Sequence, residues 1–136
     1  MNLNDIKYIQ LPKILDDRGN LTFIEWSNHI PFSIMRIYLI YDVPGGVERS
    51  GHAYKESNEL IIALSGSFDL IIDDGIEKKT YSLNRSYNGI LVPKEIWRSM
   101  NNFSTNALGL VLASTPYNES DYIYEYEAFL KFTKNG

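Results

Sequence analysis

The stretch from Gly46 to Gly66 constrains the fold more than any other part of the chain. It reads GVERSGHAYKESNELIIALSG, with His52 and Tyr54 two residues apart and Glu59 ahead of an apolar run. Residues two apart in a strand point to the same face, so the histidine and the tyrosine share one face. A turn then brings a second strand, which begins at Glu59, back beside the first, and the closing glycine permits a tight reversal. The sequence therefore predicts a pair of strands with His52 and Tyr54 directed to one side.

Short apolar runs separated by turn residues recur along the rest of the chain. Pro12 in the first run suits an edge or exchanged strand, and Asp74-Gly75 between two apolar runs is a strong hairpin signal. The tail has apolar residues at helical spacing, with Ser120 as candidate N-cap. Further strands are expected at 6–14, 21–26, 32–41, 68–72, 77–83, 87–92 and 107–113. This pattern predicts an all-β fold, a small barrel or jelly roll that forms one domain over residues 1–136, with a C-terminal helix over 120–133.

Length and composition exclude several classes of protein. A chain of 136 residues is long enough for one domain with a single core. The absence of cysteine excludes a disulfide framework and thiolate chemistry, and it favours a reducing compartment. The net charge of -4 argues against non-specific nucleic-acid binding. No apolar run is long enough to span a membrane and the first residues lack a signal-peptide pattern, so we expect a cytoplasmic protein that binds neither nucleic acid nor membrane.

The spacing of the Gly46–Gly66 stretch resembles the first motif of the cupin superfamily, and Pro93 and Asn102 keep their places in the second motif. The four positions that hold metal in metal-binding cupins are here occupied by His52, Tyr54, Glu59 and Arg98. Two of the three usual histidines are therefore replaced. A guanidinium stays protonated and cannot ligate a cation. The resemblance implies a cupin barrel, and we expect neither a metal nor any other cofactor.

Several segments, in the same order along the chain, resemble the nucleotide-sugar 3,4-ketoisomerases, a family of small cupins. The segment Arg49–Lys55 is similar to RGxHAHK. Other matches are residues 17–21 (DxRGxL), 30–38 (IPFxIKRVYYI), 64–67 (LxGS), 92–98 (VWxEM) and 112–123 (LASxYYDExDYI). The resemblance implies conversion of dTDP-4-oxo-6-deoxyglucose to a 3-oxo-6-deoxyhexose, for 3-amino-3,6-dideoxy sugars of surface glycans such as the lipopolysaccharide O-antigen. The alternatives are a cupin epimerase on a related dTDP sugar and a non-catalytic cupin that binds sugar nucleotides.

The expected chemistry assigns catalytic roles to His52 and Tyr54. Moving a carbonyl from C4 to C3 needs a base near neutral pKa, for which histidine is suited. A phenol both donates and accepts, so Tyr54 is able to relay protons between the two oxygens of an enediol, or its ring only fills the lumen. The family usually has His-x-His here, so only His52 carries over directly.

Arginines are the expected anion ligands, because a guanidinium binds phosphate oxygens in bidentate fashion. Arg36 lies in an apolar strand and is expected to pair either with Glu59 or with a diphosphate. Tyr38 shares its face, and Trp97 is a candidate for stacking on thymine. The predicted substrate-binding residues are Arg18, Arg36, Tyr38, Arg49, Lys55, Glu59, Trp97 and Arg98.

The resemblance also implies a homodimer in which the N-terminal strand, residues 1–15, joins the sheet of the partner. A barrel of this size leaves open edges that invite pairing with another chain.

Family members that give galacto and gluco products differ at the positions of Arg18 and Arg98. One type has Arg early and His late, the other Tyr early and Arg late. This chain has Arg at both positions, so the sequence leaves the C4 configuration open.

Overall fold

The computed structural model describes residues 1–135, with the backbone alone at Ser50 and Asn135. Twelve strands, two short 3-10 helices and one α-helix follow one another in these residues. The strands are β1 (Lys7–Gln10), β2 (Lys13–Ile14), β3 (Leu21–Thr22), β4 (Arg36–Ile40), β5 (Arg49–Tyr54), β6 (Glu59–Ser65), β7 (Phe68–Asp73), β8 (Lys78–Leu83), β9 (Asn88–Val92), β10 (Trp97–Asn101), β11 (Leu108–Ala113) and β12 (Tyr122–Ile123). The helices are η1 (Leu3–Asp5), η2 (Glu119–Asp121) and α1 (Tyr126–Asn135).

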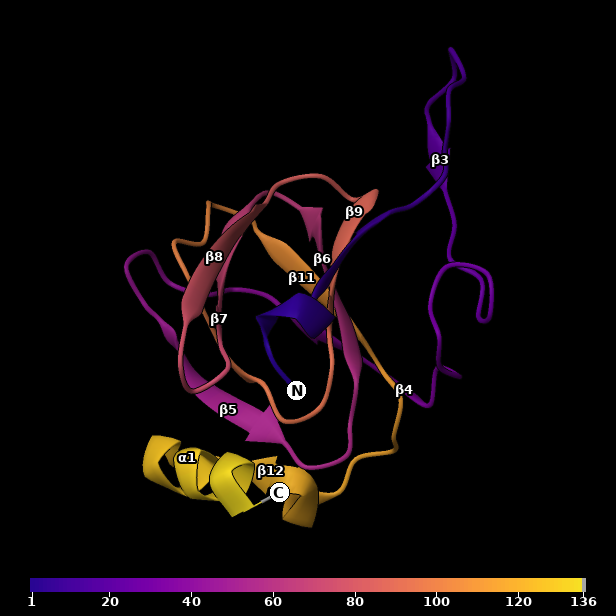
Figure 1. Ribbon diagram of the computed structural model, residues 1–136. Coiled ribbons are helices and arrows are strands. Elements are labelled where there is room, and N and C mark those ends of the chain that lie inside the picture. The colour runs from indigo at the N-terminus through magenta and orange to yellow at the C-terminus, as the bar shows by residue number, and fades with distance from the viewer. Residues whose placement is uncertain (136) are drawn as a thin grey trace.

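Two antiparallel five-stranded sheets form the barrel (Figure 1). The first sheet has the order β1-β9-β6-β11-β4, and the second has the order β12-β5-β10-β7-β8. Strands that are neighbours in space are mostly distant in sequence, as in a jelly roll. The predicted all-β barrel with a C-terminal helix is confirmed.

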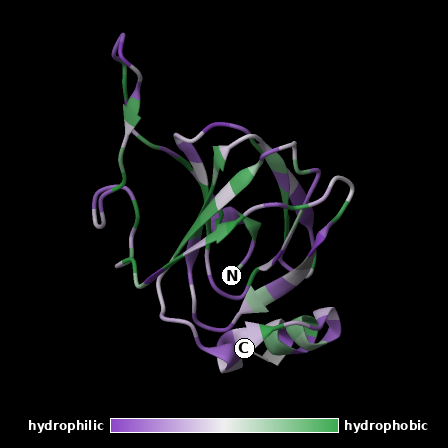
Figure 2. Ribbon diagram, turned by 180° about the vertical axis from the view of Figure 1, so that it is seen from behind, coloured by the Kyte–Doolittle hydropathy of each residue, from purple (hydrophilic) through white to green (hydrophobic). Residues whose placement is uncertain are grey.

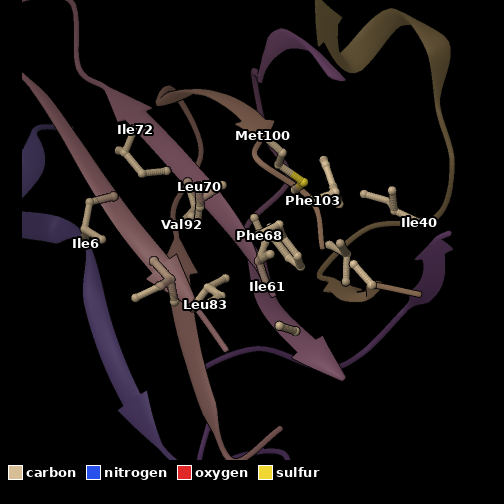
Figure 3. Close-up of a cluster of buried hydrophobic side chains, with 14 of the residues drawn as sticks. Ile6, Ile40, Ile61, Phe68, Leu70, Ile72, Leu83, Val92, Met100 and Phe103 are labelled. Carbon is tan, nitrogen blue, oxygen red and sulfur yellow. The ribbon is translucent and has the colours of Figure 1, made fainter. Parts of the chain in front are cut away.

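The main core lies between the two sheets and follows the strand alternation. Ile61 and Ala63 of β6 face Phe68, Leu70 and Ile72 of β7, all at most 1% exposed. Figure 3 shows these apolar side chains from both sheets directed toward one another. These apolar side chains fill the space between the two sheets at this point of the barrel.

The outer faces of the two sheets differ in chemistry. The outer face of β8 presents the exposed polar residues Lys78, Thr80 and Ser82. The outer face of the first sheet is apolar, and part of it is covered by Ile24, Ile30, Phe32 and Ile34 of the preceding segment. Antiparallel sheets usually cover one face and leave a polar face to water. The first sheet is thus built to be covered on both faces.

The N-terminal region folds into two pieces where the sequence predicted one strand. β1 pairs with β9 of the same chain, Lys7 opposite Leu91. Pro12 interrupts the strand, because proline has no N–H to donate to a ladder. β2 then pairs with β3 in a hairpin that stands out from the barrel (Figure 1), and Figure 2 shows hydrophobic residues along it. Strand exchange concerns a second copy of the chain and stays a prediction.

β12 extends the second sheet, and α1 packs against the outer face of β5 and β10. Tyr122 and Ile123 pair with Tyr54 and Ala53, which extends the second sheet by a strand. The helix consequently begins at Tyr126 rather than at the predicted Ser120, because the preceding residues are committed to the sheet. No helix in the described part of the chain is both long and apolar enough to cross a membrane.

Candidate active site

The candidate site lies at the end of the barrel beside β12, where side chains from both sheets converge. The strand period brings Arg36 and Tyr38 of β4 to one face, as predicted. On β5 the same period directs His52 and Tyr54 to one side, and the register of β10 places Arg98 opposite His52. The residues that the structure brings together are Arg36, Tyr38, His52, Tyr54, Glu59 and Arg98.

A buried ion pair forms the floor of the site. Arg98 Nη1 donates to Glu59 Oε1 at 2.7 Å, and the two side chains are 1% and 0% exposed. The second Arg98 nitrogen donates to the carbonyl of Ile96 at 3.0 Å. Tyr38 donates its hydroxyl proton to the other Glu59 oxygen at 2.7 Å. Buried charges are tolerated when they are paired and hydrogen-bonded in this way.

Two tyrosines above this floor are held in the neutral form. Burial and the nearby Glu59 carboxylate raise the pKa of Tyr54 far above its usual range. The same two causes, in the same order, raise the pKa of Tyr38. Arg98 stacks against the Tyr54 ring, with its guanidinium carbon 5.0 Å from the ring centroid. Both phenols can therefore act as hydrogen-bond donors and relays but not as anionic bases near neutral pH.

His52 lines two cavities. The first has a volume of about 320 Å³ and is lined by Val47, Glu48, Ser99 and Met100 among others. The second, of about 360 Å³, is lined by Arg36, Tyr54, Tyr117, Tyr122 and Tyr124 among others. Tyr38, Arg49 and His52 line both. The volumes fall at the lower end of the range for small-molecule sites, and together they give room for a sugar and its diphosphate.

The His52 ring is held by aromatic neighbours. Its centroid lies 5.0 Å from that of Tyr54, at an interplanar angle of 85°, and 5.6 Å from that of Tyr122. Tyr54 and Tyr122 also meet edge to face at 4.7 Å. These contacts fix the plane of the imidazole, as a base requires for a defined direction of proton transfer.

The contacts of Arg36 decide between the two partners that the sequence left open, Glu59 and a diphosphate. Glu59 is occupied by Arg98 and Tyr38, so Arg36 is not its partner. Arg36 Nη1 approaches the Tyr122 hydroxyl at 3.5 Å, while its Nε and Nη2 are buried without a hydrogen-bond partner. Buried N–H groups of a cation are costly when unsatisfied. This guanidinium is therefore poised to accept an anion in the second cavity.

The other predicted binding residues lie in different places. Arg49 is exposed and lines both cavities. Lys55 is exposed at the turn after β5. Arg18 lies on the projecting hairpin, 90% exposed. Arg49 therefore lies at the rim of the site, whereas Lys55 and Arg18 are not among the residues that line the two cavities.

Trp97 lies outside the cavities, on the opposite face of β10 from Arg98. Its ring contacts Tyr126 at 5.3 Å and Phe129 at 5.7 Å, and it also covers Gly51 so closely that a side chain there would collide with the indole. The structure thus places Trp97 where it anchors helix α1 to the sheet.

Three tyrosines of the second cavity were not predicted as site residues. Tyr117, Tyr122 and Tyr124 lie on the segment that leads into α1, and Tyr122 and Tyr124 stack at 5.2 Å. The helical interpretation of residues 120–133 hid Tyr122 and Tyr124, and Tyr117 was passed over although it falls in the segment that resembles LASxYYDExDYI. The alternation of Tyr122 and Tyr124 was the available signal.

The donor set of the site does not suit a metal ion. No group of three or more His, Cys, Asp or Glu side chains is placed to hold a metal in the residues that the structure describes. Arg98 and Tyr54 stand at positions where metal-binding cupins carry histidines, and the guanidinium supplies a fixed cation to Glu59 instead.

Barrel and site together define a small cupin whose cavities are lined by His52, tyrosines and arginines, and comparisons with known proteins identify its family. Residues 4–134 match the model of the family described as FdtA, WxcM-like, C-terminal. The chain is 40% identical over 126 residues to the TDP-4-oxo-6-deoxy-alpha-D-glucose-3,4-oxoisomerase of Aneurinibacillus thermoaerophilus, covering 93% of this chain and 91% of that protein. The chain therefore belongs to the FdtA, WxcM-like family of sugar 3,4-ketoisomerases.

Solved structures agree with this assignment. A 3,4-ketoisomerase from Helicobacter canadensis superposes with a TM-score of 0.92 at 41% identity, covering 96% of this chain and 98% of that one. The Thermoanaerobacterium thermosaccharolyticum 3,4-ketoisomerase, as a histidine-to-asparagine variant with TDP-4-keto-6-deoxyglucose, gives 0.95 at 33% identity, covering 98% and 97%. The same enzyme was also solved with TDP as a double variant, tyrosine to arginine and arginine to histidine (TM-score 0.95, 34% identity, 98% and 97% covered).

Proposed function

We propose that this chain is a TDP-4-oxo-6-deoxyglucose 3,4-ketoisomerase. The observation that carries the proposal is the position of His52, which lines both cavities with neutral tyrosines on one side and Arg36 nearby. The relatives named above carry this activity, or bind TDP-4-keto-6-deoxyglucose, at similar fold and length. An isomerase of this kind needs one well-placed base and a proton relay, and His52 and Tyr54 are the candidates for these two roles.

The reaction moves two protons and no net electrons. His52 removes the proton from C3, the electron pair of that C–H bond forms the C3–C4 double bond, and O4 takes a proton to give the enediol. O3 then loses its proton, the carbonyl forms at C3, and the C–C double-bond electrons take a proton at C4. Substrate and product are isomers, so the balance requires no oxidant or reductant.

We assign to Tyr54 the proton transfer between the two oxygens of the enediol. Its ring contacts His52, and its pKa is raised by burial and by Glu59, so the hydroxyl keeps its proton until a neighbour supplies another. A neutral hydroxyl can accept from one oxygen while donating to the other. This assigns to Tyr54 a relay role that does not need the second histidine of the usual family pair.

The second cavity suits the nucleoside diphosphate. The two unsatisfied Arg36 nitrogens match phosphate oxygens, and Arg49 adds a second cation at the rim. Tyr117, Tyr122 and Tyr124 offer faces on which a thymine ring can stack. With the diphosphate held there, the hexose extends past His52 toward the first cavity.

An NMR time course in deuterated water tests the function. The protein is incubated with TDP-4-oxo-6-deoxyglucose without added metal, with a 3-aminotransferase coupled to remove a 3-oxo product. We expect deuterium at C4 of a new 3-oxo sugar, or of the 3-amino sugar that the aminotransferase makes from it. Unchanged substrate with tight TDP binding would favour a non-catalytic binding protein. Exchange at C3 or C5 with the carbonyl still at C4 would instead indicate an epimerase.

We also propose that the working form is a homodimer. The outer face of β4 exposes Ile37 and Leu39, and Met35 lies just before the strand, each at least half exposed; large apolar patches mark protein interfaces. A two-fold interface would cover this face in both copies. An exchanged N-terminal strand would make to the partner's β9 the same bonds that β1 makes within one chain.

A further inference from the structure

Strand β5 carries a β-bulge immediately before His52. Its ladder with β10 places His52 opposite Arg98. The next pair joins Arg49 to Met100, so two steps along β10 match three steps along β5. β10 pairs with β7 without interruption along its whole length, so the extra residue belongs to β5. The bulge therefore lies at residues 50–51, and a bulge changes the direction of the side chains beside it.

The bulge brings Arg49 to the same side of β5 as His52. Residues three apart in a regular strand point to opposite faces, because the side-chain period is two. Arg49 and His52 are three apart, yet both line the two cavities. The extra residue of the bulge accounts for this shared face. Without the bulge, the Arg49 guanidinium would point away from the cavities, and the site would lose the cation at its rim.

Gly51 lies in the bulge, and the indole of Trp97 occupies the space where a side chain at position 51 would be. A Cβ on Gly51 would collide with Nε1, Cε2 and Cζ2 of the indole. Gly51 is not among the glycines with a positive φ, so glycine is needed here for space rather than for its backbone conformation. Trp97 thus packs directly on the backbone of the bulge.

Helix α1 fixes Trp97 from the side opposite the bulge. The Trp97 ring lies 5.3 Å from that of Tyr126, at an interplanar angle of 90°, and 5.7 Å from that of Phe129. Phe129 is fully buried, and Figure 1 shows α1 lying beside β5. The indole is therefore held between the helix and the bulge, and it is not among the residues that line either cavity.

We propose that Trp97 is a positioning residue for ligand binding: its indole fixes the bulge at Gly51, and the bulge keeps Arg49 on the face of the cavities. The proposal rests on the proposed function, in which Arg49 is a cation for the nucleoside diphosphate. Trp97 acts through Arg49 and touches no ligand. The indole is large and rigid, so a smaller side chain at position 97 leaves the bulge without support.

A double-mutant cycle between Trp97 and Arg49 tests the proposal. The four proteins are the wild type, Trp97→Ala, Arg49→Ala and the double variant, and calorimetry gives the Kd of each for TDP. Loss of the charged hydrogen bond from Arg49 should weaken binding by about tenfold. Trp97→Ala should weaken it to a similar degree, and the double variant no further. Independent losses that multiply to about a hundredfold, or a wild-type Kd in Trp97→Ala, would overturn the proposal.

Turnover of TDP-4-oxo-6-deoxyglucose gives a second readout. A cation that binds the diphosphate equally in the ground state and the transition state affects KM and leaves kcat nearly unchanged. We therefore expect Trp97→Ala to raise KM with kcat close to that of the wild type, as Arg49→Ala does. A fall in kcat with an unchanged KM would place the effect at His52 rather than Arg49 and would contradict the proposal.

Two further variants separate positioning from a general loss of stability. Leu130→Ala loosens the packing of α1 but leaves the indole on Gly51. Its melting temperature should fall while its Kd for TDP keeps the wild-type value. Gly51→Ala tests the same contact from β5, because its methyl group displaces the indole or the strand. It should reproduce the weaker TDP binding of Trp97→Ala, and it replaces that variant in the cycle if Trp97→Ala does not fold. TDP binding weakened equally in Leu130→Ala, or a wild-type Kd in Gly51→Ala, would refute the positioning role.

The wild-type protein, assayed in parallel, separates this proposal from the proposed function. A wild type that binds TDP but leaves TDP-4-oxo-6-deoxyglucose unchanged would refute the proposed function, while the cycle measured with TDP would still decide the role of Trp97. An active wild type with independent losses in the cycle would refute the positioning role alone. A wild type that binds no TDP would overturn both.

Discussion

At the scale of single residues, His52 is expected to govern turnover rather than ligand affinity. The ring lines both cavities, whereas the unsatisfied cation of Arg36 lies at the second cavity. His52→Asn should lower kcat by about a hundredfold, the usual contribution of a positioned base, with the Kd for TDP nearly unchanged. Steady-state kinetics and calorimetric titration with TDP measure the two effects. Wild-type turnover in the variant would remove His52 from the mechanism.

Replacements of Tyr54 test whether its hydroxyl or only its ring contributes to turnover. Tyr54→Phe keeps the contacts with His52 and Arg98 but removes the relay, so we expect turnover to fall about tenfold. Tyr54→His restores the usual family pair and should leave an active enzyme. The kcat values of the two variants check this. An unchanged kcat in the phenylalanine variant would mean that the ring only fills space.

Because Arg98 and Glu59 form a buried ion pair, replacing Arg98 alone should lower the free energy of unfolding more than replacing both residues. Arg98→Met leaves a buried carboxylate uncompensated and should lower the free energy of unfolding by about 3–5 kcal/mol. Replacing Glu59 by Leu in the same chain should recover much of this loss. Urea unfolding of the two variants gives the comparison, with Arg36→Met, which breaks no ion pair in the described contacts, as the matched control. Equal losses in the single and double variants would contradict the argument.

At the scale of elements, helix α1 is attached to the barrel through a hydrogen bond that is lost at alkaline pH. Burial of its ring, and then the bond from its hydroxyl to Asp73 at 2.9 Å, raise the pKa of Tyr126 from 10.0 to about 12. A raised folded pKa means that this stabilisation is complete below pH 10.0 and is lost as pH rises toward 12.

Tyr126→Phe should therefore be less stable than wild type at neutral pH, and the difference should vanish near pH 12. Thermal or urea unfolding of both proteins from pH 7 upward follows the difference. Because both proteins contain the other tyrosines, the titration of those groups affects both stabilities equally and drops out of the difference. A difference that persists unchanged to high pH would show that ring packing, rather than the bond to Asp73, sets the effect.

The strand period allowed prediction of which residues share a face, but not of which side chains meet across the barrel. His52 with Tyr54, and Arg36 with Tyr38, followed from spacing alone because the period of a strand is fixed. The pairing of Arg98 with Glu59 depends on the register and closure of two sheets, which local spacing does not determine. Trp97 and Arg98 are adjacent in sequence, so the strand necessarily sends them to opposite faces, and the sequence had grouped them together. The start of α1 was misplaced because tertiary pairing of β12 with β5 overrode helical spacing.

At the scale of the whole molecule, the N-terminal strand links folding to assembly. Deletion of residues 1–12 removes β1 and leaves the edge of β9 without its partner strand. We expect monomer or aggregate with a lowered melting temperature, measured by light scattering and thermal unfolding. A truncated protein that stays dimeric and equally stable would contradict the exchanged strand.

Arg18 and Arg98, the two positions that the family resemblance links to the C4 configuration, lie in surroundings of opposite tolerance to substitution, and this suggests an order for evolutionary change. Arg18 sits on an exposed turn where a substitution alters few contacts, whereas Arg98 is fixed by Glu59 and by a backbone carbonyl in the interior. A lineage can alter the exposed position first at little cost to folding, while the interior position changes only when its neighbours accommodate the lost cation. A chain with arginine at both positions is what such a path looks like part of the way along.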